Sequence, residues 1–419
     1  MSVDQTDVLI VGAGPAGLSA AITLKRLGVK RVVVVDREDE AGGMPRLCHH
    51  TGFGLRDLHW AYTGPDYARH YARLAHSAGI EIRTSTTVTG WQDESTVAIT
   101  SPRGLGEIRA GAILLATGCR ERPRAARLVP GRRPQGVFTT GSLQRFVYQH
   151  HLPVGKRAVI VGAELVSLSA LMTLAHAGVS VVGMVTEHPN HQIAFPYRAA
   201  KWLYADLMAR VPVLSGARVT GLVGGQRLTG VEITRTATLK QETLACDAVV
   251  FTGDWIPEHE LARSGGVRLD TGTRGPQVGP GYHTSTQGVF AAGNLLRGAE
   301  TADACALEGA QAARQIQAFL TGSPWPAQGL PLAVEPPIQW IYPNVINAAG
   351  ASSGSSAFHF RVQTFCRDIR VTVAQNRKEV FTQSYRSLAP NDTVRLEGRW
   401  SSAIDPADGA VRVGLESDR

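Results

Sequence analysis

A glycine-rich turn near the start of the chain constrains its fold more than any other feature. Residues 8–21 read VLIVGAGPAGLSAA, so an apolar strand runs into Gly12, Gly14 and Gly17, which have G-x-G-x-x-G spacing. A helix of small residues follows, and a second apolar strand ends in Asp36. Gly12 allows a tight turn, Gly14 lets backbone approach a pyrophosphate, and Gly17 lets helix and strand pack closely. The free N–H groups at the helix start attract phosphate.

Asp36 completes this pattern. It lies nineteen residues beyond Gly17, where a carboxylate at a strand end accepts hydrogen bonds from an adenosine ribose. A glycine-rich turn alone also occurs for steric reasons. Because strand, turn, helix, spacing and acid agree here, the sequence predicts a dinucleotide-binding unit.

Length and composition predict a multidomain globular protein. At 419 residues the chain is too long for one compact core, so two or three domains are expected. Its 43% apolar content and 45 glycines fit an α/β protein with many tight turns.

The net charge of +8 is concentrated in residues 120–133, which hold six arginines. A nucleic-acid surface is one interpretation of this segment, and a solvated loop that helps to neutralise cofactor phosphates is the other. No aromatic stacking platform accompanies the arginines, so we favour the loop and expect no nucleic-acid partner.

The cysteines and the N-terminus restrict chemistry and location. Five cysteines are scattered singly, without the C-x-x-C pair typical of dithiol redox, zinc or iron–sulfur sites, so no metal is expected. The N-terminus lacks a basic leader, and its first apolar run is the nucleotide-binding strand itself. No apolar run is long enough to span a bilayer, which predicts a cytoplasmic protein without a transmembrane segment.

The chain repeats itself at an offset of 150 residues. Residues 18–29, LSAAITLKRLGV, recur as LSALMTLAHAGV at 168–179, with seven of twelve positions identical. So long a period indicates two related nucleotide-binding domains, the second inserted in the first.

The second copy is altered where a ligand would bind. Gly14 is replaced by Glu164 and Gly17 by Ser167, so a carboxylate stands where a pyrophosphate needs bare backbone. Like charge repels phosphate. Asp36 maps onto Thr186, with Glu187 beside it. Ordinary NAD binding by the second domain is therefore not expected.

Other segments suggest ligand contacts or separate domains. Gly42 and Gly43 indicate a second close approach of backbone to ligand, and Arg46 is the residue of the following loop with the best prospect of touching it. The histidines of that loop (His49, His50 and His59) are expected to face water or phosphate. Residues 322–356 are rich in Pro, Gly and Ser and predict a linker or wrapping arm, whereas the period-two apolar pattern beyond residue 358 predicts a small β domain.

These motifs, with ATG at 116–118 and GVFAAGN at 288–294, resemble the FAD-dependent pyridine nucleotide-disulfide oxidoreductase superfamily over residues 5–320. The resemblance implies FAD in the first domain, next to the ATG strand and Gly293-Asn294. The superfamily commonly has Asp where this chain has Asn294, and we expect Asn294 still to accept a ribityl hydroxyl. The helix that opens near Thr301 would place its positive end near the reduced flavin.

A narrower resemblance comes from GMPRLCHHTGFGLRD, starting at residue 43, and from ATGCRERPRAARLVPG, starting at residue 116. Both look like flavoprotein subunits of heteromeric amino-acid, opine and D-hydroxyproline dehydrogenases and of hydrogen cyanide synthase. This implies an amine or amino-acid substrate and, as partner, a second flavoprotein subunit. An NAD(P)H-dependent flavin reductase and a non-catalytic electron-relay or scaffold subunit stay open as alternatives.

The sequence thus predicts an α/β protein with two Rossmann-like domains, the second inserted in the first, and a small C-terminal β domain. The expected boundaries are 1–125 and 256–322 for the FAD-binding domain, 126–255 for the degenerate domain, 323–357 for the linker and 358–419 for the β domain. No catalytic residue is assigned. The candidate FAD-binding residues are Gly12, Gly14, Pro15, Ala16, Gly17, Asp36, Arg37, Gly43, Arg46, Val88, Thr117, Gly118, Gly293 and Asn294.

Overall fold

A central sheet built from both ends of the predicted first domain organises the structure. The computed structural model describes residues 3–193, 211–327, 329–346, 357–405 and 408–417. In the sheet the strand order is β5-β2-β1-β8-β7-β6, and β19 lies beside β8. The strands are β1 (Val3–Val11), β2 (Val32–Val35), β5 (Glu81–Arg83), β6 (Thr87–Trp91), β7 (Thr96–Ser101), β8 (Gly104–Leu115) and β19 (Val289–Ala291).

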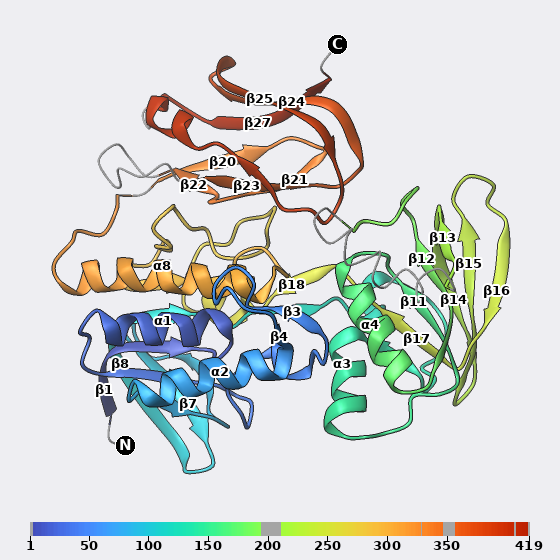
Figure 1. The fold of residues 1–419 in the computed structure, drawn as a ribbon. Coiled ribbons are helices and arrows are strands. Elements are labelled where there is room, and N and C mark those ends of the chain that lie inside the picture. The colour runs from blue at the N-terminus through green and yellow to red at the C-terminus, as the bar shows by residue number, and fades with distance from the viewer. Residues whose placement is uncertain (1–2, 194–210, 328, 347–356, 406–407, 418–419) are drawn as a thin grey trace.

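The parallel part of this sheet is buried, which explains its continuous apolar runs. All four residues of β2 and the last four of β1 are buried, as expected for strands covered on both faces. Helices α1 (Pro15–Arg26), α2 (Gly64–Ser77) and α8 (Ala302–Leu320) run side by side in Figure 1. The loop between β2 and α2 carries η1 (Met44–Leu47) and two short paired strands, β3 (Thr51–Phe53) and β4 (Tyr62–Thr63).

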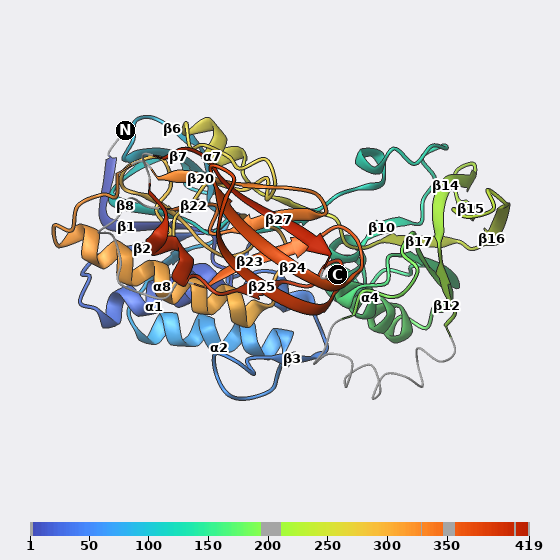
Figure 2. The same cartoon turned by 90° about the horizontal axis from the view of Figure 1, so that it is seen from above.

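A second nucleotide-binding fold is inserted between β8 and β19. Its parallel sheet has the order β10-β17-β11-β12-β13, and an antiparallel sheet β14-β15-β16 lies next to it. The chain leaves the first unit through β9 and returns through β18, which pairs with β9 antiparallel. Figure 2 shows this unit beside the first one. Its elements, with those that flank it, are β9 (Cys119–Glu121), η2 (Arg124–Arg127), β10 (Val137–Thr139), α3 (Thr140–Gln144), η3 (Arg145–Gln149), β11 (Arg157–Val161), α4 (Leu165–His176), β12 (Ser180–Thr186), β13 (Val213–Ser215), β14 (Ala217–Gly224), β15 (Leu228–Arg235), β16 (Gln241–Ala245), β17 (Ala248–Phe251), β18 (Trp255–Pro257) and α7 (Glu260–Ser264).

The internal repeat predicted from sequence is confirmed element by element. Helix α4 begins and ends 150 residues after α1, and β1 and β11 end at Val11 and Val161. Each of these strands therefore delivers the chain into an equivalent turn and helix. The α/β architecture with one Rossmann-like unit inside another follows from this match.

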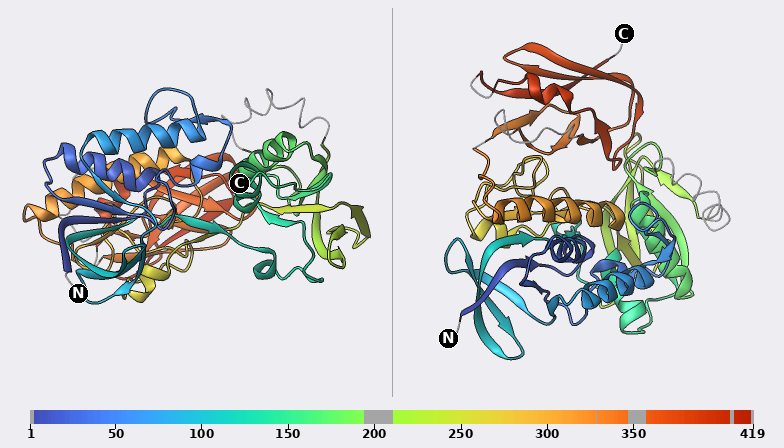
Figure 3. Two further views of the ribbon diagram at one scale, coloured as in Figure 1. Left: turned by 90° about the horizontal axis from the view of Figure 1, so that it is seen from below. Right: turned by 60° about the vertical axis from the view of Figure 1, so that its left-hand side comes forward.

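Two further sheets form the C-terminal part, with orders β22-β20-β27-β24-β25 and β21-β23-β26. They enclose their own apolar core, which includes Phe358, Phe360 and Trp400. In Figures 1 and 3 these sheets lie on the side of α8 that faces away from α1. The strands are β20 (Leu330–Val334), β21 (Ile338–Tyr342), β22 (Val345–Ile346), β23 (Phe358–Val362), β24 (Cys366–Gln375), β25 (Lys378–Leu388), β26 (Val394–Leu396) and β27 (Val411–Ser417), with η5 (Arg399–Ala403).

The expectation that residues 323–357 form a linker is wrong for residues 330–346. This stretch contains β20, β21 and β22, and β21 buries Ile338, Trp340 and Tyr342. The prolines that suggested a linker flank β21 at Pro337 and Pro343, and strand ends tolerate proline. Residues 328 and 347–356 of the expected linker lie outside the described residues.

Candidate functional site

The turn between β1 and α1 combines two glycines that packing requires with one that it does not. A Cβ on Gly12 would lie 2.3 Å from the Ala116 carbonyl oxygen, and one on Gly17 would lie 1.9 Å from the Gly12 carbonyl oxygen. Gly14 has ordinary extended backbone, with φ −80° and ψ −174°, and its nearest neighbour would be 4.0 Å away. Protein contacts thus leave the space above Gly14 open.

The helix that starts at this turn offers its N-terminus to the same space. Pro15 occupies the first position, Ala16 and Gly17 follow, and no side chain caps the first turn. Backbone N–H groups at such an end attract anions. The open space at Gly14 and the uncapped helix together form a cradle that fits a pyrophosphate.

Gly42 and Gly43 form a second wall of this cradle. The N–H of Gly42 donates to the Ala13 carbonyl at 2.8 Å, and a Cβ on Gly43 would lie 2.9 Å from the Gly14 Cα. Both glycines have positive φ, a region that side chains disfavour. The sequence predicted a close approach of backbone to a ligand at this pair. In the structure, the pair closely approaches Ala13 and Gly14 of the glycine turn.

Asp36 lies at the end of β2 and braces the turn. Its Oδ2 accepts from the Ala13 N–H at 2.6 Å, and its Oδ1 accepts from the Glu38 N–H at 2.9 Å. A carboxylate has about four lone-pair positions, so it can still accept from a ribose. The neighbouring Arg37 is exposed and lies 3.8 Å from the Glu258 carboxylate.

Arg46 is bound by acids of its own chain. Its guanidinium lies 3.1 Å from Glu40, 3.5 Å from Glu38 and 3.6 Å from Asp39, and only 14% of its side chain is exposed. Its Nε is buried without a hydrogen-bond partner. Arg145 and Arg46 both lower the pKa of Glu38, and the Arg145 hydrogen bond is the largest cause.

The ATG segment and β18 are tied together at the end of β8. The Thr117 hydroxyl donates to the Glu258 carbonyl at 2.8 Å, and the Glu258 N–H donates to the Gly118 carbonyl at 2.9 Å. Gly118 has a φ of 76° and nothing within 4 Å of a Cβ position. Val88 lies on β6, two residues beyond Thr86, whose N–H donates to the Asp36 carbonyl oxygen at 2.8 Å.

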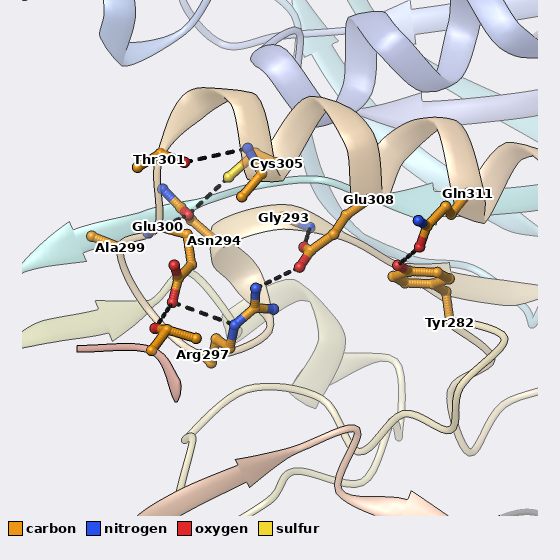
Figure 4. A network of polar contacts seen from close by, with 12 residues as sticks. Tyr282, Gly293, Asn294, Arg297, Ala299, Glu300, Thr301, Cys305, Glu308 and Gln311 are labelled. Atoms are coloured by element: carbon orange, nitrogen blue, oxygen red, sulfur yellow. Dashed lines mark hydrogen bonds and ion pairs between the residues drawn. The ribbon is translucent and has the colours of Figure 1, made fainter. Parts of the chain in front are cut away.

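Gly293 and Asn294 meet the first turn of α1 from the opposite side. A Cβ on Gly293 would lie 2.8 Å from the Ala16 Cβ, and the Gly293 N–H donates to the Glu308 carboxylate at 3.2 Å. Figure 4 shows this segment at the entry to α8. The structure therefore brings Gly12, Gly14, Ala16, Gly43 and Gly293 together from three parts of the sequence.

Asn294 does not offer its carbonyl oxygen as expected. The Oδ1 atom accepts from the Glu300 N–H at 2.9 Å and from the Cys305 thiol at 3.0 Å (Figure 4). Both lone pairs of an amide oxygen are then engaged. These two bonds leave the amide NH₂ of Asn294, a donor rather than an acceptor, for any further partner.

Helix α8 begins at Ala302, as the expected start near Thr301 indicated. The Thr301 hydroxyl caps it by accepting from the Ala304 N–H at 3.4 Å. Asp303 in its first turn accepts from the N–H groups of Gly54 and Arg56 at 3.0 and 2.9 Å. The first turn of α8 therefore holds the loop before α2 through the Asp303 carboxylate.

The equivalent turn of the inserted unit is filled by side chains. Glu164, in place of Gly14, has nearly the same backbone, with φ −104° and ψ −176°, and is 6% exposed. A Cβ on Gly162 would meet the Thr252, Glu164 and Ser167 side-chain oxygens at 2.0, 2.7 and 2.9 Å. These three oxygens lie together beside Gly162, at the start of α4.

Two more substitutions close the same space. Ile193, in place of Gly43, is 3% exposed, and Thr186, in place of Asp36, accepts from the Gln192 amide at 2.9 Å. Burial raises the pKa of Glu164, and the Thr252 and Ser167 hydroxyls only partly offset it. The inserted unit keeps the fold but not the open cradle.

The comparison with family models decides the class of protein. The model described as pyridine nucleotide-disulphide oxidoreductase matches residues 6–313. The chain belongs to this family. It is an FAD-dependent oxidoreductase, and the cradle at Gly14 with Asp36 beside it fits that dinucleotide.

Individual relatives share this core but are longer. The oxidoreductase is 28% identical to the alpha subunit of the sarcosine oxidase of Rhizobium meliloti (strain 1021), over 74% of this chain and 30% of that protein. It is 27% identical to one subunit of an opine oxidase of Rhizobium meliloti, over 73% of this chain and 60% of the relative. The chain thus spans less than two thirds of either relative.

Among solved structures, the thioredoxin reductase of T. acidophilum has the same fold over 76% of this chain and 99% of its own, with a TM-score of 0.62 and 22% identity. A second observation concerns the helices. Across the part of the oxidoreductase that the structure describes, none is both long and apolar enough to cross a membrane.

Four arginines of the basic segment bind their own chain. Arg120 contacts Glu258 and Glu260, Arg122 contacts Asp254, and the other two hold backbone carbonyls. Arg124 donates to the carbonyls of residues 129, 131 and 132, and Arg127 to those of residues 252 and 253. The expectation that these arginines neutralise cofactor phosphates is replaced by a structural role, which the sequence could not show because most of the partners are distant.

The histidines of the loop after β2 contact the inserted unit. His49 stacks on Tyr148 with ring centroids 3.9 Å apart, and His50 Nε2 lies 3.0 Å from the Ser169 hydroxyl. Burial lowers the pKa of His50. The expectation that they face water or phosphate is therefore wrong for His50, because the loop lies between the two nucleotide-binding units, whereas His49 stacks on Tyr148 and is still exposed. His59 is also exposed.

Proposed function

We propose that the oxidoreductase removes a hydride from the carbon next to the nitrogen of an amino acid or related amine. The C–H bond breaks with its electron pair, the nitrogen loses a proton to solvent, and a C=N bond forms. Bound FAD supplies the two-electron acceptor. The reaction is balanced without a second substrate, because the electrons stay on the cofactor until an acceptor removes them.

The closed turn of the inserted unit is the observation that carries this proposal. Glu164, Ser167 and Ile193 are buried side chains at the positions where the first unit has the glycines 14, 17 and 43. A nicotinamide is therefore a poor source of electrons for this chain, and a small organic donor is the better one. The relatives named as sarcosine oxidase and opine oxidase subunits point to an amine as that donor.

The FAD-binding residues of this proposal are described from the pyrophosphate end of the cofactor to its flavin end. Gly12, Gly14 and Gly17, with Pro15 and Ala16 at the helix start, would hold the pyrophosphate, and Asp36 would hold the adenosine ribose. Gly43 and Arg46 close that end, while Thr117, Gly118, Gly293 and Asn294 would lie along the flavin end. Arg37 is the weakest member because its side chain is exposed, and Val88 would lie near the adenosine end, since Thr86 just before it donates to the Asp36 carbonyl oxygen.

No side chain of this chain is needed as a base in the hydride step. An amine that arrives deprotonated needs only orientation against the flavin. The residues proposed here accordingly bind and orient, and Asn294 does so as a donor. We further propose that a second flavoprotein subunit receives the electrons, since both relatives are named as subunits.

Anaerobic mixing tests the proposal. The purified, FAD-loaded chain is mixed separately with sarcosine, an opine, free amino acids, NADH and NADPH while flavin absorbance is followed. We expect bleaching by at least one amine and little or none by either nicotinamide. Rapid bleaching by NADH or NADPH would instead favour a flavin reductase, and no bleaching by any donor would favour an electron-relay subunit.

A further inference from the structure

A buried ionic cluster joins the C-terminal sheets to the segment that enters α8. It contains Arg297, Glu300 and Glu308 from the nucleotide-binding core and Arg361 from β23. Their side chains are between 3% and 13% exposed. Two cations and two carboxylates balance in charge, so each is needed to compensate another away from water.

The C-terminal residues hold Glu300 directly. Arg361 Nη2 donates to Glu300 Oε1 at 3.0 Å and to the Ala299 carbonyl at 3.4 Å. The Thr393 hydroxyl donates to the same carboxylate oxygen. Arg361 also lies over the Trp340 ring, 5.0 Å from its centroid. The guanidinium is thus fixed on one face by packing and on its edge by hydrogen bonds.

The cluster continues to Gly293 and Asn294. Backbone N–H of Glu300 donates to Asn294 Oδ1, and Glu308 joins the Gly293 N–H to the Arg297 guanidinium (Figure 4). Arg297 in turn lies 4.3 Å from the centroid of Tyr342, a residue of β21. Two routes therefore lead from the C-terminal sheets to the pair proposed to face the flavin.

Electrostatics agree with this geometry. Burial acts to raise the pKa of Glu300, but Arg297 and Arg361 outweigh it and hold the pKa below its ordinary value of 4.5. Glu300 is therefore ionised and depends on both cations. Removing Arg361 would leave an undercompensated buried carboxylate one residue before the α8 cap at Thr301.

We propose that Arg361 is a positioning residue for the flavin: through Glu300 it holds Asn294 and the start of α8, so the C-terminal sheets set FAD affinity and flavin potential. The inference rests on the proposed FAD site. It gives the C-terminal part a role inside the oxidoreductase, although the thioredoxin reductase of the same fold matches without this part over 99% of its length.

The test uses the full chain with FAD removed and added back. Arg361→Met keeps the packing on Trp340 but removes the charge. We expect FAD to bind more weakly by on the order of tenfold, as for a buried charge that loses its partner. The flavin midpoint potential should become more negative, because the unpaired carboxylate of Glu300 disfavours an anionic reduced flavin.

Three further variants separate positioning from general damage. Arg412→Met removes a 66% exposed arginine of β27 and should change neither quantity. Arg361→Met combined with Glu300→Gln should bring the potential back toward that of the unmodified chain, because the cluster is again neutral. Thr393→Val keeps all charges and should weaken FAD binding in the same direction by a smaller factor, and it carries the test if Arg361→Met does not fold.

Unchanged FAD affinity and potential in Arg361→Met, or in Thr393→Val where Arg361→Met does not fold, would overturn the inference. An equal effect of Arg412→Met would do the same. None of these measurements uses an amine. Failure of the proposed amine oxidation would therefore leave them intact, and their failure would leave the amine experiment intact.

Discussion

At the scale of single residues, the two copies of the turn provide an internal comparison. Gly14 and Glu164 occupy the same helix-capping position with nearly the same backbone dihedrals. Backbone strain therefore does not explain the glycine at position 14. The nearest protein atom would be 4.0 Å from a Cβ on Gly14. The remaining reason for glycine is therefore the close approach of a ligand.

This comparison predicts the effect of Gly14→Glu. The variant should fold, because Glu164 shows that the turn accepts this side chain and because a carboxylate at a helix N-terminus stabilises it by about 0.3–1 kcal/mol. FAD should be lost, because the side chain fills the cradle. The flavin-to-protein absorbance ratio measures this, with Glu164→Gln as the matched control that keeps FAD. Stoichiometric flavin in Gly14→Glu would refute the assignment.

Glu164 itself predicts a pH dependence. Its folded pKa is raised above 4.5 by burial, so the stabilisation that its protonated form provides is present below pH 4.5 and is lost as the pH rises through the folded value. Glu164→Gln resembles the protonated form. The thermal midpoint of the variant should therefore exceed that of the unmodified chain by a margin that grows as the pH rises above about 4.5.

The exposed Glu187, next to Thr186 in the sequence, provides the control for this experiment, because Glu187→Gln removes one carboxylate without changing the interior. A margin for Glu164→Gln that stays constant with pH would contradict the explanation.

At the scale of elements, α1 and α8 pack side by side (Figure 1) with almost no room between them. A Cβ on Gly309 would lie 2.0 Å from the Ala16 carbonyl oxygen, and a Cβ on Gly293 would lie 2.8 Å from the Ala16 Cβ. Small residues on both helices let their backbones approach. This contact joins the start of α1 to α8 and to Gly293 before it.

Gly309→Ala is expected to weaken this contact. Alanine favours a helix over glycine by about 1 kcal/mol, but overpacking costs about 1–3 kcal/mol, and a carbonyl 2.0 Å away must move. We expect a lower thermal midpoint and faster loss of FAD on dilution. Gly90→Ala on β6 is the matched control, because nothing lies within 4 Å of that position. Equal behaviour of the two variants would contradict the packing argument.

At the scale of the whole molecule, the proposed amine oxidation needs an exit for its electrons. The sequence has no C-x-x-C pair, and the nucleotide turn of the inserted unit is filled. The C-terminal sheets lie on the side of α8 that faces away from α1 (Figures 1 and 3). Under the proposed function, electrons taken from an amine would therefore leave through another protein, a quinone or oxygen.

We expect a second flavoprotein to accelerate turnover. The amine should reduce the flavin of the isolated chain in a single turnover, and steady-state oxidation should rise when the partner is added. Stopped-flow reduction and steady-state dye assays on the same preparation separate the two steps. Amine turnover by the isolated chain with oxygen or dye, at a rate that no partner improves, would contradict this expectation.

The sequence by itself determined the parts of this protein whose chemistry is local. A glycine turn with its strand, helix and acid lies within about thirty residues, and the offset of 150 residues then identified the second unit and its altered turn. Glu164 was correctly placed where Gly14 lies in the first copy because backbone geometry follows local spacing. The half-buried strands after residue 358 were also predictable from their period of two.

Only the tertiary structure decided which distant groups meet. It paired Arg361 with Glu300 across sixty-one positions of sequence, engaged the Asn294 carbonyl oxygen with Cys305, and gave partners to the arginines of residues 120–127. It also made strands of residues 330–346, whose prolines suggested a linker. These outcomes depend on which surfaces pack together, and local spacing carries no information on the partner that a buried charge or a strand edge will find.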